Sequence, residues 1–184
     1  TLFFAIKGER FDGHDFVKSA AQAGASAALV SKEIDKAGIP CVLVEDTVDA
    51  LQKIATGYRG MFENLKVVGI TGSVGKTTTK EMISCVMEEK YKTLKTEGNF
   101  NNDIGVPRMI FRLDENYTGA VLEMGMSNLG EISVLTKAVK PTCSVISNIG
   151  VSHIENLGSR ENILKAKLEI LEGMEEGSTL FVNG

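Results

Sequence analysis

The chain has 184 residues, and its 20 lysines and arginines against 24 aspartates and glutamates give a net charge of −4. Hydrophobic residues make up 43% of the sequence, which is typical of a globular chain. A chain of this length can bury enough surface to fold without disulfides or a structural metal, as one domain or two small ones. The net negative charge, with no run of Lys and Arg, argues against a nucleic-acid partner. Apolar stretches such as 41–44 have the length of a strand, so no membrane insertion is expected.

The cysteines and the two ends of the chain carry further information. Cys41, Cys85 and Cys143 lie far apart in or beside apolar runs, and we interpret them as buried thiols of a reducing compartment, without metal. The chain begins inside an apolar run at 1–6 and ends in a strand-like segment at 179–184. We interpret it as a segment of a longer protein.

Strand-like and helix-like segments alternate from the first residue onward. A helix is expected at 15–23 with Asp15 as its N-cap. Apolar residues recur at helical spacing from Val48, behind Asp46 and Thr47, either of which can cap that second helix. Strands are expected at 1–6, 27–30 and 41–44.

After Asn64 the alternation restarts. Strands are expected at 66–71, 120–124 and 142–147, and helices at 76–89, 129–139 and 160–171. Alternation of this kind is typical of a parallel sheet covered by helices. The sequence therefore predicts an α/β fold, in which a small domain at 1–63 precedes part of a P-loop, Rossmann-like parallel-sheet domain at 64–184.

Residues 67–79, V-V-G-I-T-G-S-V-G-K-T-T-T, combine an apolar strand, a glycine turn and a Lys-Thr pair that opens a helix. Backbone N–H groups near Gly72 and Gly75 can approach phosphate oxygens, Lys76 can reach the β- and γ-phosphates, and the Thr77 hydroxyl can ligate Mg²⁺. The general pattern G-x-x-x-x-G-K-[ST] asks for glycine at position 70, where this chain has Ile70. A plain glycine turn is the alternative, but the pattern favours ATP binding. The expected nucleotide contacts are Thr71, Gly72, Ser73, Val74, Gly75, Lys76, Thr77 and Thr78.

The stretch 69–81, G-I-T-G-S-V-G-K-T-T-T-K-E, resembles the shortened T-G-x-x-G-K-T loop of the Mur ligases, which accounts for the missing glycine. Segments 3–14, 97–107 and 122–125 resemble the branch of that family that adds D-alanyl-D-alanine to UDP-N-acetylmuramoyl-tripeptide. The resemblance runs along nearly the whole chain. It implies a UDP-substrate-binding domain at 1–63, an incomplete central ATP-binding domain at 64–184, and a missing C-terminal domain that closes over ATP.

Two strand-end residues are candidate metal ligands. Glu123 ends the apolar run 120–122, at the edge where ligands gather in parallel sheets, although a charge there is by itself more often simply solvated. His153 lies in the loop that follows the strand at 142–147, and a lone loop histidine usually has no special role. The resemblance implies that both bind Mg²⁺ together with Thr77.

The turn-rich segments supply candidate substrate contacts. Asn99, Asn101 and Asn102 lie in a segment with no helix or strand pattern, and such stretches are usually turns, although their amides can bind a sugar or a phosphate. The resemblance implies that Asn99 and Asn101 contact the substrate and that Asn102 contacts the nucleotide. Asp12 and His14 belong to an Asp-Gly turn, where they are either solvated or close to the uracil nucleotide.

Lys167 lies in the amphipathic stretch 163–170, whose pattern alone favours an exposed lysine. Its Ala-Lys-Leu context, 14 positions after His153, resembles the place where Mur ligases carry a lysine carbamylated by CO₂. Such a carbamate can ligate a second Mg²⁺. Because carbamylation needs a neutral amine, we expect Lys167 to be buried and its pKa to be lowered.

The resemblance implies an ATP- and Mg²⁺-dependent amide ligase of peptidoglycan precursor synthesis, monomeric and located in the bacterial cytoplasm. Its catalytic residues are expected to be Lys76, Glu123, His153 and Lys167, and the 184-residue chain alone is expected to be inactive. The alternatives are the sister ligase that adds the third amino acid, a folylpolyglutamate synthetase, or a nucleotide-binding switch that ligates nothing. Segments 7–14 and 97–107 favour the dipeptide-adding type, and the N-K-x-D motif of many GTPases is absent.

Overall fold

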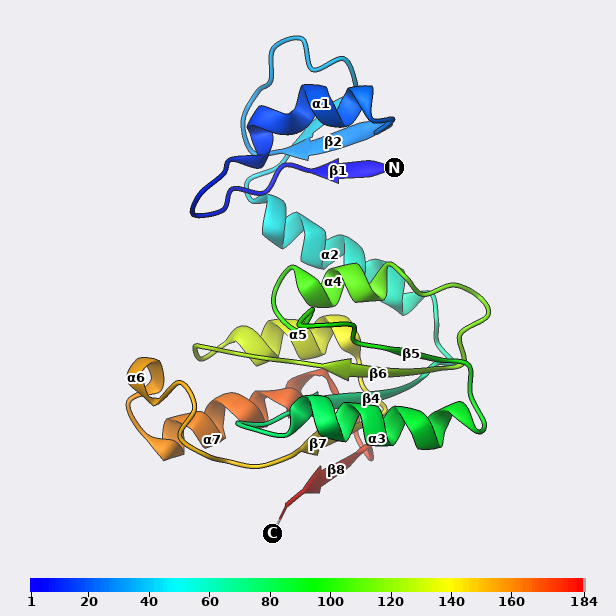
Figure 1. Cartoon of the computed structure of the whole chain (residues 1–184), viewed down its shortest axis with the longest axis vertical. Helices are drawn as coiled ribbons and strands as arrows, with labels where there is room; N and C mark the ends of the chain where they lie inside the picture. The colour runs from blue at the N-terminus through cyan, green and yellow to red at the C-terminus, as the bar shows by residue number, and fades with distance from the viewer. Residues whose placement is uncertain (184) are drawn as a thin grey trace. The chain divides into compact units, whose positions relative to one another are not determined.

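The computed structural model describes residues 1–183 and divides the chain into two compact units, Thr1–Ile54 and Ala55–Gly184. Each unit contains a parallel β-sheet with helices packed on it (Figure 1), which confirms the predicted α/β class. Helix α2 (Thr47–Gly60) runs through the division at residues 54 and 55. The domain boundary between residues 63 and 64 stays a prediction.

The smaller unit is built on a three-stranded parallel sheet in the order β1 (Leu2–Phe4), β2 (Ala27–Val30) and β3 (Cys41–Leu43). The 3₁₀ helix η1 (Gly13–Phe16) leads into α1 (Val17–Gln22). The prediction that Asp15 caps one continuous helix is wrong, because Asp12 Oδ1 accepts the backbone N–H of His14 at 3.0 Å and starts η1. The buried core consists of Ala5, Val17, Ala28, Val30 and Ala37.

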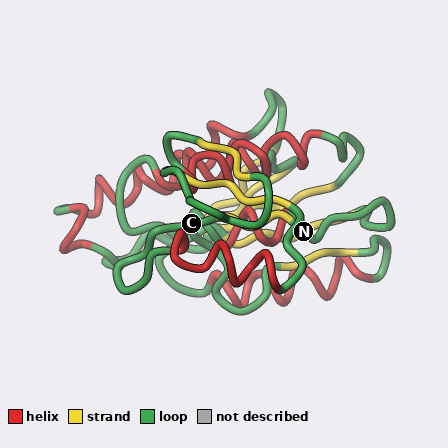
Figure 2. The backbone as a smooth tube through the Cα atoms, turned by 90° about the horizontal axis from the view of Figure 1, so that it is seen from above, coloured by secondary structure: helices red, strands yellow, loops and turns green. Residues whose placement is uncertain are grey.

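The larger unit contains a five-stranded sheet in the order β5-β6-β4-β7-β8, in which every neighbouring pair is parallel. Its strands are β4 (Lys66–Thr71), β5 (Thr93–Lys95), β6 (Gly119–Glu123), β7 (Cys143–Ile146) and β8 (Thr179–Val182). Every residue of β6 and all but the first of β4 are buried, as expected for central strands covered on both faces. The edge strand β8 is mostly exposed. Figure 2 draws strands in yellow and shows red helices outside them.

Helices cover both faces of this sheet. Helix α3 (Lys76–Glu88) packs Ile83 and Met87 against Val68, Ile70 and Val121 on one face. The larger core on the other face takes side chains from six helical segments (Figure 1). These are the end of α2, α4 (Gly105–Ile110), α5 (Glu131–Val139), α6 (Ile154–Leu157), α7 (Arg160–Leu168) and the 3₁₀ helix η2 (Glu169–Gly173).

Several predicted boundaries need correction. Helix α4 occupies part of the segment in which no helix was expected, because Asn102 Oδ1 accepts the N–H of Gly105 at 2.8 Å and starts the helix, and Pro107 falls in the first turn, where proline is tolerated. Helix α5 begins at Glu131 rather than Leu129, because Gly130 is left-handed with φ 88°. The predicted helix 160–171 becomes 3₁₀ from Glu169 onward.

The prediction that all three cysteines are buried is also wrong. Cys85 is exposed on α3, and Cys41 and Cys143 are half-buried. All three are free thiols. Helical spacing on α3 turns Cys85 away from the face that carries Ile83 and Met87, so the apolar neighbours in the sequence are not neighbours in the core.

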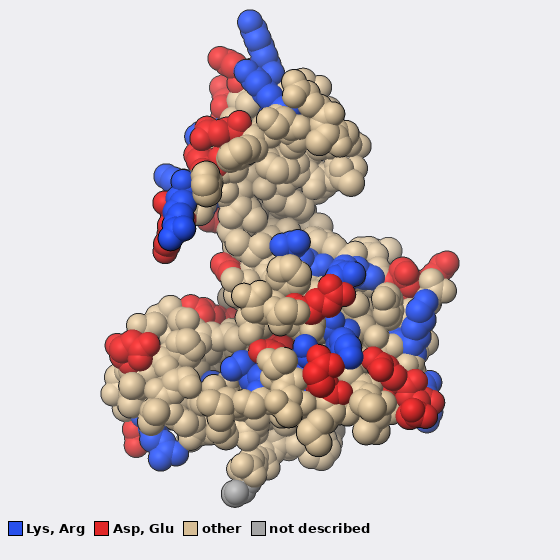
Figure 3. Space-filling view, viewed as in Figure 1, with Lys and Arg blue, Asp and Glu red and all other residues tan. Residues whose placement is uncertain are grey.

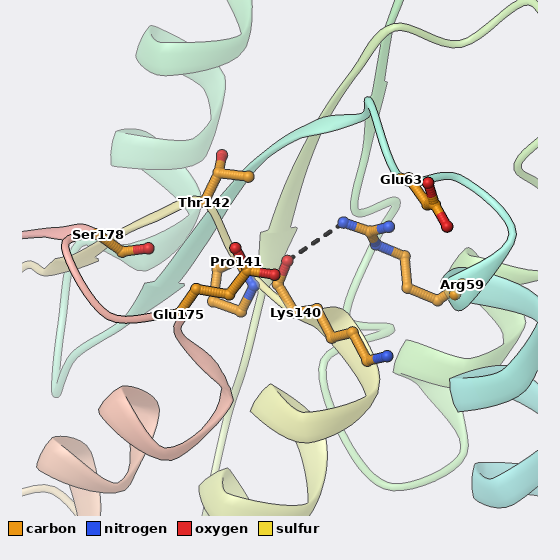
Figure 4. A pocket seen from close by; sticks show the side chains of 8 residues that line it. Arg59, Glu63, Lys140, Pro141, Thr142, Glu175 and Ser178 are labelled. Carbon is orange, nitrogen blue, oxygen red and sulfur yellow. Dashed lines mark hydrogen bonds between the residues drawn. The ribbon is translucent and has the colours of Figure 1, made fainter.

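Arg59 fixes the edge of the larger unit at which the strands begin. It is 4% exposed, and its guanidinium donates to three backbone carbonyls: Val139 O at 2.9 Å, Phe62 O at 2.8 Å and Lys140 O at 3.2 Å. Figure 4 shows the bond to Lys140. Burial lowers the pKa of Arg59. Carbonyls at and beyond the end of α5 lack helical partners, so Arg59 satisfies them beside a hollow of about 500 Å³.

The surface carries both signs of charge. Acidic and basic side chains are interspersed over the face shown in Figure 3. Among the helices of residues 1–183, none combines the length and the apolar character needed to cross a bilayer.

Candidate nucleotide-phosphate site

The loop between β4 and α3 is shaped by two glycines. Gly72 and Gly75 have φ of 151° and 81°, and a Cβ at Gly72 would lie 1.9 Å from Ser147 Oγ, so only glycine fits there. No side chain of the described residues caps α3 at Gly75. The first N–H groups of α3 are therefore available to an anion. Lys76 folds over the loop and donates from Nζ to Gly72 O at 2.9 Å.

A buried carboxylate lies beside this loop at the end of β6. Glu123 is 3% exposed; its Oε2 accepts the Thr77 hydroxyl at 3.0 Å and its Oε1 accepts the Asn101 amide at 2.9 Å. Its backbone N–H donates to Thr96 Oγ1 at 2.9 Å. The carboxylate is thus held in one orientation by side chains from α3 and from the asparagine-rich segment.

The donor set at this point suits Mg²⁺. Carboxylate and hydroxyl oxygens are the hard ligands that Mg²⁺ prefers, and in nucleotide sites it commonly takes one or two carboxylates plus substrate phosphates. Within residues 1–183 no group of three or more His, Cys, Asp and Glu side chains is arranged to enclose a metal. The Thr77–Glu123 pair therefore fits a cation shared with bound phosphates rather than an all-protein metal site.

A cavity of about 200 Å³ opens next to the loop. Its walls come from the carboxyl ends of β4, β6 and β7 and from α7, the edge at which parallel sheets bind ligands. It is lined by Gly72, Lys76, Asn101, Asn102, Gly125, Met126, Ser127, Glu131, His153 and Lys167. The structure thus brings six of the predicted site residues to one cavity from separate parts of the sequence.

Lys167 lies at the wall of this cavity and is buried. Its exposed fraction is 2%, so the exposed lysine that the helical pattern alone favoured is not what the structure contains. Burial, with a smaller contribution from the charge of Lys76, lowers the pKa of Lys167 to about 8. An ammonium is costly in such a place, and the neutral amine is correspondingly favoured.

Comparison with known proteins identifies the family. Residues 70–184 match the Mur ligase middle domain, and residues 1–59 match the Mur ligase family catalytic domain. The chain belongs to the Mur ligase family.

Individual Mur ligases are similar along the whole chain. The UDP-N-acetylmuramoyl-tripeptide–D-alanyl-D-alanine ligase of Bacillus subtilis (strain 168) is 48% identical over 185 residues, which is 100% of this chain and 40% of the relative. The enzyme of the same name from Escherichia coli (strain K12) is 41% identical over 99% of this chain and 40% of its own length. The chain therefore spans about 40% of the length of these relatives.

Solved Mur ligase structures share the fold. MurF from Acinetobacter baumannii superposes with a TM-score of 0.94 at 40% identity, covering 98% of this chain and 40% of that one. MurF ligase from Thermotoga maritima in complex with ADP gives a TM-score of 0.91 at 39% identity, covering 98% of this chain and 42% of that one.

His153 lies just past the loop that follows β7, in an unusual backbone conformation. It is the N-cap of α6 (Ile154–Leu157), with φ 62°. A residue other than glycine in the left-handed region is strained by about 1 to 3 kcal/mol and is often found at functional sites. Its side chain lines the same cavity as Lys76 and Lys167. Its role as a metal ligand stays a prediction.

The three candidate asparagines have different surroundings. Asn101 is bound to Glu123, and Asn102 both lines the cavity and caps α4. Asn99 lines a neighbouring hollow of about 230 Å³, which Asn102 and Arg108 also line. The structure therefore brings Asn101 and Asn102 to the phosphate site and leaves Asn99 outside it.

In the smaller unit, Asp12 and His14 form a closed hydrogen-bonded cluster. His14 is 5% exposed; its Nδ1 lies 2.6 Å from Asp12 Oδ1, and its Nε2 accepts the Ser31 N–H at 2.8 Å. An acceptor at Nε2 places the proton of the neutral ring on Nδ1. The ammonium of Lys32, 2.9 Å from Asp12 Oδ2, lowers the pKa of Asp12, with a further contribution from the backbone N–H of His14. His14 is thus not a solvated turn residue.

Sequence reasoning missed the residues that hold the phosphate loop in place. Ser147, Asn148 and Ser152 follow β7 and hydrogen-bond directly to the loop. Their signal was a run of small and polar residues, S-N-I-G-V-S, after an apolar strand. The sequence does not connect this run with the phosphate loop. The connection follows from the pairing of β7 with β4, because the loop begins where β4 ends.

Proposed function

We propose that the full-length protein is an ATP-dependent amide ligase that joins D-alanyl-D-alanine to UDP-N-acetylmuramoyl-tripeptide in bacterial peptidoglycan precursor synthesis, and that this chain supplies its nucleotide-phosphate site. The main support is the arrangement of Lys76 at the cavity, the uncapped N-terminus of α3 beside it, and the Thr77–Glu123 pair, which is joined to the cavity wall by the bond from Asn101 to Glu123. Relatives named for this activity are similar over the whole chain, and one related structure holds ADP. We place the protein in the cytoplasm as a monomer.

In this proposal the ATP phosphates bind at the phosphate loop, contacting residues 71–78. Asn102, which also lines the cavity, contributes a further contact. Lys76 leaves Gly72 O and neutralises charge on the β- and γ-phosphates. Thr77, Glu123 and His153 would hold Mg²⁺, which when bound neutralises negative charge on the phosphoryl group during its transfer. Lys167, as a carbamate, holds a second Mg²⁺.

The proposed reaction has two displacement steps. An oxygen of the terminal carboxylate of the tripeptide attacks the γ-phosphorus; the bond to the bridging oxygen breaks, and ADP leaves an acyl phosphate behind. The dipeptide amine then attacks the acyl carbon, phosphate leaves, and the nitrogen loses a proton. Chemistry of this kind depends on positioning and charge stabilisation, so none of the residues named here needs to act as a nucleophile.

Four further residues, Asn99, Asn101, Asp12 and His14, take part in the proposed binding of the UDP-linked substrate. Asn99 and Asn101 contact the substrate, and for Asn101 this contact adds to its bond with Glu123. Asp12 and His14 shape the part of the smaller unit that receives the uracil nucleotide, their cluster with Ser31 and Lys32 holding the turn in one conformation.

The decisive experiment measures phosphate release by the full-length protein with ATP, Mg²⁺ and UDP-N-acetylmuramoyl-tripeptide. Release should require D-alanyl-D-alanine. A single amino acid in its place tests the sister ligase, and a folate with glutamate tests a folylpolyglutamate synthetase. ATP hydrolysis that depends neither on the UDP-linked tripeptide nor on D-alanyl-D-alanine would indicate a nucleotide switch and contradict the proposal.

A further inference from the structure

The phosphate loop is attached to the segment that follows β7. Ser73 is 8% exposed although it lies in a loop, because that segment covers it. Five hydrogen bonds that involve a side chain join the two: Ser73 N and Val74 N to Asn148 Oδ1 at 3.1 and 2.9 Å, Ser147 Oγ to Val74 O at 2.6 Å, Gly150 N to Ser73 Oγ at 2.9 Å, and Ser152 Oγ to Ser73 O at 3.2 Å. Both polar groups of the Ser73–Val74 peptide, the Ser73 carbonyl and the Val74 N–H, are therefore hydrogen-bonded to this segment.

One side-chain oxygen, Asn148 Oδ1, takes the two loop N–H groups that would otherwise be available to a phosphate. The N–H of Ser73 also reaches Asn148 O at 3.2 Å. The N-terminus of α3, which no side chain of the described residues caps, remains the place where an anion can be bound by N–H groups. The loop and the anion site thus use different sets of N–H groups, and a phosphate need not displace Asn148.

The same segment continues into the residues on the other side of the cavity. Five residues after Asn148 the chain reaches His153 in its left-handed conformation, and Arg160 at the start of α7 donates from Nη2 to Ile149 O at 2.9 Å. Helix α7 carries Lys167. The attachment at Asn148 therefore lies between the phosphate loop and both of the groups that face it.

We propose that Asn148 is a positioning residue that keeps the phosphate loop and residues 147–153 together as one rigid body, with and without nucleotide, so that His153 is held at a fixed place relative to the bound phosphates. Close packing supports this rigidity. A Cβ at Gly72 would overlap Ser147 Oγ at 1.9 Å, and a Cβ at Gly150 would lie 3.1 Å from Ser73 Cβ, so neither strand-end segment has room to slide. The inference rests on the proposed function only in using ADP as a probe.

Amide hydrogen exchange in the full-length protein tests the rigid attachment without a variant. The Ser73 and Val74 amides should be protected before ADP is added, and MgADP should change their exchange rates less than twofold. Asn148→Ala should raise both rates at least tenfold, whereas Asn148→Asp, which keeps an acceptor oxygen, should restore protection. Unprotected Ser73 and Val74 amides in the wild type, or protection that appears only with ADP, would overturn the proposal.

A double-mutant cycle tests the link to His153. The MgADP dissociation constant is measured for wild type, Asn148→Ala, His153→Ala and the double variant, with exposed Asn156→Ala replacing Asn148→Ala in a control cycle. The effect of His153→Ala should shrink at least fivefold when Asn148 is absent and stay unchanged beside Asn156→Ala. Additive effects in both cycles would reject the link. A wild type that binds no MgADP would instead contradict the proposed function, so the two failures are distinguishable.

Discussion

Lys76 is a half-buried ammonium that hydrogen-bonds to a carbonyl of its own loop, Gly72 O. If it neutralises phosphate charge, Lys76→Ala in the full-length protein should lower turnover by at least ~10²-fold, which corresponds to about 2.7 kcal/mol of transition-state stabilisation. The thermal unfolding temperature should stay nearly unchanged, because the variant loses only one hydrogen bond, which lies at the edge of a cavity. Lys66→Ala, an exposed lysine at the other end of β4, is the matched control. Full activity in Lys76→Ala would reject the assignment.

Lys167 provides a test that depends on pH. With its pKa lowered to about 8, roughly one in ten of these side chains is neutral at pH 7, against about one in 3,000 at the ordinary value. Because CO₂ adds to the neutral amine, ¹³C-bicarbonate should give a carbamate NMR signal that grows between pH 6.5 and 8.5 and is missing in Lys167→Ala. Activity lost in that variant should return partly with acetate. Full activity of Lys167→Ala in CO₂-free buffer would return this residue to a purely structural role.

Single residues could be predicted from sequence where the chemistry lies in one short stretch. Lys76 and Thr77 are recognisable within the loop motif, and Glu123 is recognisable as a charge that ends an apolar strand. The distant partners of His14 and Asp12 were not predictable, because Ser31, which bonds to His14, and Lys32, which bonds to Asp12, follow another strand. Asn148 was missed for the same reason: its bonds to Ser73 and Val74 join positions about 75 residues apart.

At the scale of elements, the N-terminus of α5 is held by a residue from another helix. Glu169 of η2 accepts the N–H groups of Gly130 and Ser133 at 2.7 and 3.1 Å. Glu169→Ala should destabilise the protein by about 1 kcal/mol or somewhat more, because two N–H groups lose a charged acceptor at a helix N-terminus. Chemical denaturation measures the change, with exposed Glu176→Ala as the control. Equal stability of the two variants would contradict this capping role.

Elements with a strong local signal were predicted closely. The strand at 66–71 has the bounds that the sequence indicates, and the helix expected at 76–89 ends one residue earlier. The start of α5 was placed two residues early, because Gly130 adopts a left-handed conformation before the helix and the bond from its N–H goes to the distant Glu169. Helix α4 was missed because Gly105 and Pro107 are residues typical of turns. The hydrogen bond from the Gly105 N–H to Asn102 Oδ1, which supports the start of the helix, is not evident from the sequence.

At the scale of the whole molecule, the order β5-β6-β4-β7-β8 explains why distant residues meet. Strand β4 lies in the middle of the sheet, with β6 and β5 on one side and β7 and β8 on the other. The loops after β4, β6 and β7 therefore lie next to one another at the carboxyl edge. The alternating pattern predicted a parallel sheet. Strand order depends on long-range packing, which the sequence pattern does not encode, and this order puts Glu123 and His153 on opposite sides of the phosphate loop.

The 184-residue chain by itself should bind nucleotide without catalysing ligation. It holds the phosphate loop and the Thr77–Glu123 pair, yet it spans about 40% of the length of the ligases it resembles, and such sites are commonly completed when further parts of the protein close over the nucleotide. Isothermal titration should therefore detect weak MgADP binding that Lys76→Ala reduces, while assays with UDP-linked tripeptide and ATP detect no ADP formation that depends on D-alanyl-D-alanine. Dipeptide-dependent ADP formation by this chain would show that residues 1–184 already contain a complete ligase site. Loss of all MgADP binding would show that the cavity beside Lys76 does not bind nucleotide phosphates on its own.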